Sequence, residues 1–128
     1  MTEPDREQLR SQVFEILALI GDPEAQLRYE RDVPIANVPA ELVCMWFEDV
    51  FRPDELPDFP ASFSKAEFAV LSAFSEFYDA RVDALPTRSG VVGLHGSPVW
   101  TVVMERANET LKRVAPEMAL AETWYPKE

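Results

Sequence analysis

The chain has 128 residues, of which 47% are hydrophobic, and 23 Asp and Glu against 12 Lys and Arg give it a net charge of −11. This length fits one domain that buries about 65–70% of the surface of its unfolded chain, and the hydrophobic content excludes the low-hydrophobicity class of disordered proteins. The negative charge disfavours binding to nucleic acid or anionic lipid, because both are held by cationic side chains. It favours a basic protein partner, or it serves solubility alone.

The chain shows no targeting or membrane signal. The first ten residues, MTEPDREQLR, lack the apolar core of a signal peptide. The longest apolar run, residues 42–47, is far shorter than the ~20 residues that a membrane-spanning helix requires. The single cysteine, Cys44, has no partner for an intrachain disulfide, which fits a reducing compartment. We therefore expect a cytoplasmic protein without membrane contact.

Helical patterns open the chain. A first helix is predicted over 2–20, because its apolar residues recur at spacings of three and four. Asp22 followed by Pro23 predicts the N-cap and first residue of a second helix, which ends near residue 31. A connection follows, and a third helix is predicted over 40–51. Its large apolar side chains occupy nearly all faces of the helix, which predicts a central, buried position.

The clearest helix start is FSKAEF, residues 63–68. Ser64 and Glu67 have the spacing of a capping box, and the two phenylalanines that of a hydrophobic staple. This helix is predicted to run to about residue 85, before Pro86.

The C-terminal third holds a break and one more helix. Residues 86–97 contain three of the four glycines, and they are predicted to form a flexible loop of irregular coil. A Ser-Pro start at 97–98 predicts a last helix to about residue 114, and residues 116–128 form a tail. The expected fold is therefore all-α, with residues 1–128 forming a single-domain bundle of about five helices.

No pattern in the sequence identifies a reaction. His95, the only histidine, lies between glycines and is interpreted as an ordinary loop residue, although an enzyme centred on it is a third alternative. Cys44 lies among apolar neighbours, which indicates an inert core thiol. The carboxylates lack the spacing of metal ligands, the basic residues are scattered, and no phosphate-binding loop occurs. We predict no catalytic residue, no cofactor and no metal.

Acidic residues gather beside the most hydrophobic segment. Six acids lie between residues 41 and 58 against one base, Arg52, and a second acidic row follows the polar face of the long helix. If the rows adjoin, they form a negative docking face; the alternative is a merely solvated surface. Phe51, Phe59 and Tyr78 are candidates for an exposed aromatic anchor within it. The predicted partner-binding residues are Glu48, Asp49, Asp54, Glu55, Asp58, Glu76, Asp79 and Asp83.

Four stretches occur in an order that resembles a group of small, acidic, helical bacterial proteins: GDPEAQLRYE at 21–30, ELVCMWFEDVF at 41–51, FSKAEFAVLSAFSEFYDARVDAL at 63–85 and GSPVWTVVMERANETL at 96–111. Some members of this group look like immunity proteins of polymorphic or contact-dependent toxin systems. The resemblance implies a protein that protects the producing cell by binding a toxin domain. It carries over no functional residue, because the shared positions are largely caps and core.

We therefore expect a non-catalytic binding protein whose acidic surface neutralises a toxin domain, which would be basic. The alternative is a homo-oligomeric helical scaffold or adaptor that uses apolar surface instead of charge. The sequence leaves the oligomeric state and the identity of the partner open.

Overall fold

The computed structural model describes residues 6–53 and 59–118. These residues form six helices, five of them with seven or more residues, and no strand. The predicted all-α bundle is confirmed. The helices are α1 (Arg6–Ile20), α2 (Pro23–Asp32), α3 (Val38–Cys44), α4 (Lys65–Asp79), α5 (Gly90–His95) and α6 (Pro98–Val114). Shorter helical turns are η1 (Met45–Val50), η2 (Pro60–Ser62), η3 (Val82–Ala84) and η4 (Pro116–Met118).

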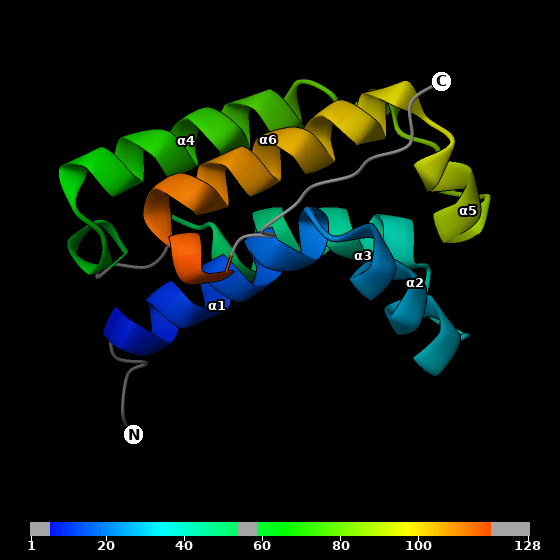
Figure 1. Cartoon of the computed structure of the whole chain (residues 1–128), viewed down its shortest axis with the longest axis horizontal. Helices are drawn as coiled ribbons and strands as arrows, with labels where there is room; N and C mark the ends of the chain where they lie inside the picture. Colours follow the sequence, from blue (N-terminus) through cyan, green and yellow to red (C-terminus); the bar gives the residue numbers. More distant parts are fainter. Residues whose placement is uncertain (1–5, 54–58, 119–128) are drawn as a thin grey trace.

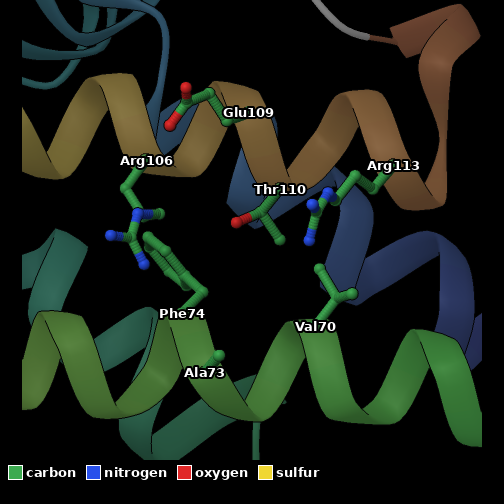
Figure 2. A pocket seen from close by; sticks show the side chains of 7 residues that line it. All are labelled: Val70, Ala73, Phe74, Arg106, Glu109, Thr110 and Arg113. Atoms are coloured by element: carbon green, nitrogen blue, oxygen red, sulfur yellow. The ribbon is translucent and has the colours of Figure 1, made fainter.

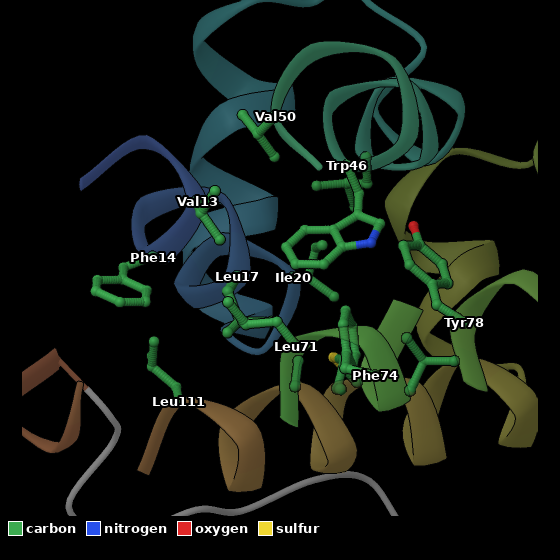
Figure 3. Packing of buried hydrophobic residues seen from close by; sticks show 14 of the residues in the cluster. Val13, Phe14, Leu17, Ile20, Trp46, Val50, Leu71, Phe74, Tyr78 and Leu111 are labelled. Carbon is green, nitrogen blue, oxygen red and sulfur yellow. The ribbon is translucent and has the colours of Figure 1, made fainter. Parts of the chain in front are cut away.

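The helices are arranged as two packed layers. α4 and α6 run antiparallel, side by side, and α1 packs against α6 from below (Figure 1). The η1 turn also packs on α1, while α2, α3 and α5 contact one another at one end of the molecule. Figure 3 shows the resulting core, where side chains from α1, η1, α4 and α6 point toward a common centre.

Four helices begin where the local sequence specifies. Asp22, Asn37 and Ser97 each accept a hydrogen bond from the backbone N–H three residues on, at helix starts that carry proline in the first turn. Ser64 and Glu67 form the predicted capping box in full. The predicted cap at Thr2 lies outside the described residues.

The long helix ends earlier than predicted. α4 stops at Asp79 instead of continuing to residue 85, and a 3₁₀ turn follows. In a continuing α-helix the Arg81 N–H would bind the Phe77 carbonyl. Here the Arg81 guanidinium takes that carbonyl at 3.0 Å, and the Arg81 N–H binds the Tyr78 carbonyl instead. A side chain thus replaces the backbone donor and tightens the turn.

The third predicted helix forms but changes type. Its α-helical part ends at Cys44, and residues 45–50 form a π-helical turn, closed by a bond from the Phe51 N–H to the Trp46 carbonyl. The Trp46 ring is fully buried, stacks on Phe51 and meets Phe74 edge-on, each with 5.1 Å between ring centroids. The expected buried position is confirmed for Trp46, whereas the wide turn was not predicted.

The expectation of irregular coil over 86–97 is wrong for residues 90–95, which form α5. A carboxylate 61 positions away caps this helix, because Glu30 Oε2 accepts from the Val91 N–H at 2.9 Å. Gly90 has φ +67°, and a Cβ there would lie 2.9 Å from Glu30 Oε2. The glycine is therefore required by a cap that is remote in sequence.

One ion pair joins α1 to α4, and it predicts that the stability of the fold depends on pH. Arg10 donates to both Glu67 oxygens, at 2.7 and 3.1 Å, and this pairing lowers the pKa of the Glu67 carboxyl from its usual 4.5. Because the folded pKa lies below the unfolded value, the contribution to stability is full above the unfolded pKa and is lost as the pH falls through the folded pKa.

We therefore expect Glu67→Gln to lower the free energy of unfolding at neutral pH. The difference in this free energy between the variant and the parent protein should disappear as the pH falls below about 4. Urea unfolding across a pH series measures both quantities. Glu76→Gln, an exposed carboxyl of the same helix, is the control. A difference in free energy of unfolding between Glu67→Gln and the parent protein that does not change with pH would contradict the stabilising role of the ion pair between Arg10 and Glu67.

Candidate functional site

The structure describes five of the eight predicted partner-binding residues. All five are exposed: Glu48 and Asp49 on η1, Glu76 and Asp79 on α4, and Asp83 on η3. We call these five the acidic face. The other three, Asp54, Glu55 and Asp58, lie outside the described residues.

Two of the three segments that carry these acids, η1 and α4, pack against each other. Trp46 Nε1 of η1 donates to Ser75 Oγ of α4 at 3.2 Å, and the Phe47 ring lies 5.1 Å from the Tyr78 ring. Asp79 stands one helical turn beyond Ser75. Its carboxylate therefore lies on the flank of α4 that faces η1.

Exposed carboxylates also occur elsewhere. α1 carries Glu7 and Glu15, and α6 carries Glu105 and Glu109. Around η1 the charge has one sign, because residues 41–50 hold acids and no base. None of the five acids of the acidic face forms an ion pair with a described residue.

The aromatic residues expected to project from this surface as anchors for a partner are buried or partly buried. Phe59 and Tyr78 are fully buried in the core, so that prediction is wrong for both, and Phe51 is partly buried. The Tyr78 hydroxyl has no hydrogen-bond partner among the described residues, and burial raises its pKa. Large rings support the acidic face from behind instead of projecting from it.

Cys44 immediately precedes η1 and is partly exposed. Burial raises the pKa of its thiol, and the neighbouring carboxylate of Glu48 raises the pKa further. The thiol therefore stays protonated at neutral pH, which is the unreactive form. The raised pKa agrees with the predicted inert thiol, whereas the predicted position in the core is wrong, because Cys44 is partly exposed.

On its opposite flank α4 faces α6 across a groove of about 360 Å³ (Figure 2). The residues lining it are Val70, Ala73, Phe74, Arg106, Glu109, Thr110 and Arg113. Arg106 is held in place by the Phe77 ring, 4.2 Å from its guanidinium. Neither Arg106 nor Arg113 forms an ion pair with a residue that the structure describes. The sequence analysis missed this groove, although a spacing of four and then three places positions 106, 110 and 113 on one helix face.

His95 is the last residue of α5 and belongs to a partly buried hydrogen-bond network, so its interpretation as an ordinary loop residue is wrong. Gln26 is fully buried; its Nε2 donates to the carbonyls of Leu19 and Ile20, both at 2.8 Å. Its Oε1 accepts from Trp100 Nε1 at 3.2 Å and from His95 Nε2 at 2.7 Å. His95 therefore carries its proton on Nε2. Burial lowers the pKa of this imidazole.

His95 Nε2 is bound by an amide, which does not titrate, so this contact does not supply the acid–base partner that an enzyme centred on His95 would need. The sequence analysis missed Gln26, which looks like one polar residue of a polar helix. Within residues 6–53 and 59–118, no group of three or more His, Cys, Asp or Glu is placed to hold a metal ion. No helix in these ranges has the length and apolar character to span a membrane.

Comparison with protein-family models, with curated proteins and with solved structures finds no match for this chain. The resemblance to immunity proteins therefore stays a hypothesis.

Proposed function

We propose that this chain is a cytoplasmic binding protein without a reaction of its own, which neutralises a basic toxin domain by covering it with the acidic face. The observation that carries the proposal is the packing of η1 on the flank of α4, which brings the exposed acids Glu48 and Asp49 of η1 close to the flank of α4 that carries Asp79. Unpaired carboxylates gathered on one surface attract a basic partner and speed its encounter.

The acidic face also has a rigid support. Behind it, Trp46 bonds to Ser75 and meets Phe74 edge-on, and Phe47 packs on Tyr78. A surface held in one conformation loses little entropy when a partner binds. An occluding protein needs this preorganised, complementary surface and no chemistry.

Co-expression with the product of the adjacent open reading frame tests the proposal. We expect the two proteins to copurify, and the Kd to rise at least about tenfold between about 50 and 500 mM NaCl, because salt screens exposed charges. The absence of a complex, or an affinity that is indifferent to salt, would count against charge-driven docking.

A specific observation favours the second candidate, a homo-oligomeric scaffold. Among the described residues, most exposed large hydrophobic side chains lie on α2, on the turn after it and on α5, which contacts α2. Ile35 is 97% exposed and Val92 74% exposed, and exposed apolar surface marks interaction sites.

Size-exclusion mass at low and high salt separates the two candidates. A scaffold stays oligomeric at high salt, and Ile35→Asp disrupts it. The toxin-binding proposal predicts a monomer at both salt concentrations.

A further inference from the structure

We propose that the groove between α4 and α6 binds a small organic anion, whose oxyanion group is held by Arg106, Thr110 and Arg113 and whose apolar part lies against α4. This site is on the opposite flank of α4 from the acidic face, and the inference does not depend on toxin binding.

Thr110 provides the first observation. The residue is only 4% exposed, and its hydroxyl forms no hydrogen bond with any residue that the structure describes, although a helical threonine often binds the carbonyl four positions back. Figure 2 shows the hydroxyl pointing into the groove, between the Arg106 and Arg113 side chains. The Thr110 side chain is largely buried, but its hydroxyl reaches the groove, where an oxygen atom of a ligand would accept its hydrogen bond.

The two arginines provide the second observation. Neither arginine forms an ion pair within residues 6–53 and 59–118, and the two guanidinium groups lie in the space between α4 and α6 (Figure 2). The contact with Phe77 fixes Arg106 before any ligand arrives. Guanidinium groups bind carboxylate and phosphate through two parallel hydrogen bonds. Glu109 also lines the groove, and in Figure 2 its carboxylate lies over α6, farther from α4 than the two guanidinium groups.

The shape of the groove indicates more than a bare ion. Its α4 wall consists of Val70, Ala73 and Phe74, and its volume of about 360 Å³ falls within the range of small-molecule sites. An inorganic phosphate would leave the apolar wall uncovered. An anion with an apolar body fills both parts, and carboxylates and phosphate esters share this chemistry.

An NMR titration of the full chain with phenyl phosphate, benzoate, inorganic phosphate and benzyl alcohol tests the proposal. We expect saturable shifts at residues 70–77 and 106–113 with at least one aromatic anion, and binding at least about tenfold weaker for inorganic phosphate and for benzyl alcohol. Phenyl phosphate against benzoate decides which oxyanion is preferred. No saturable shift with either aromatic anion below about 10 mM, or equal binding of benzyl alcohol, would overturn the proposal.

Two variants locate the site. Arg113→Gln and Thr110→Val are each expected to weaken binding of the aromatic anion by at least about tenfold. Thr110→Val keeps the side-chain shape and removes an unpartnered hydroxyl, so the variant is expected to stay folded, which circular dichroism checks. Arg88→Gln, an exposed arginine outside the groove, is the charge-matched control. Equal weakening by Arg88→Gln and Arg113→Gln would show that only net charge matters and would overturn the assignment.

Discussion

Replacing Gln26 by leucine is expected to lower the free energy of unfolding by about 3–4 kcal/mol, because a buried polar group left without its partner costs about 1–3 kcal/mol. The substitution removes the donor for two carbonyls at the end of α1 and the acceptor for Trp100 Nε1. Leucine has a similar volume, so the loss reports hydrogen bonding more than a cavity. Urea unfolding at neutral pH measures it.

Arg28→Leu, an exposed position of the same helix, is the control, and its effect should stay within about 0.5 kcal/mol. A loss below about 1 kcal/mol for Gln26→Leu would contradict the role of Gln26 as the buried link between α1, α5 and α6.

Reversing two charges of the acidic face is expected to have the largest effect on partner binding. Glu48→Lys combined with Asp79→Lys places like charges opposite a basic partner, which costs several kcal/mol. The affinity for the product of the adjacent open reading frame should fall at least about 100-fold at low salt, with much of the loss in the association rate. Surface plasmon resonance measures both rates.

A second double variant separates the acidic face from net charge. Glu7→Lys with Glu15→Lys changes the total charge by the same amount but alters exposed positions of α1. It should weaken binding only a few-fold, through the long-range field. Equal losses in the two double variants would mean that no particular surface docks the partner.

The sequence predicts those parts of the fold that are specified within a few residues. The capping box at Ser64 and Glu67, and the caps at Asp22 and Ser97, each depend on neighbours three positions away. The start of α5 depends on Glu30, 61 positions distant. No local pattern in the sequence indicates the contact between Glu30 and Val91, and the glycines of residues 90–96 therefore led to a prediction of coil.

The candidate sites show the same limit. Composition identified the acids, but the position of Asp79 relative to η1 depends on the contact between Trp46 and Ser75. Gln26 looks like an ordinary polar residue until its four hydrogen bonds are seen. The arginines of the groove are seven positions apart, and their significance arises because neither forms an ion pair in the part of the chain that the structure describes, which a sequence does not show.

Amide hydrogen exchange of the chain, free and bound to the product of the adjacent open reading frame, tests the central claim most directly. Docking through the acidic face predicts slower exchange in the bound state over residues 45–50 and 75–83, with little change in α2 and α5. Protection confined to α2 and α5, where Ile35 and Val92 are exposed nearby, would contradict it and favour the apolar surface.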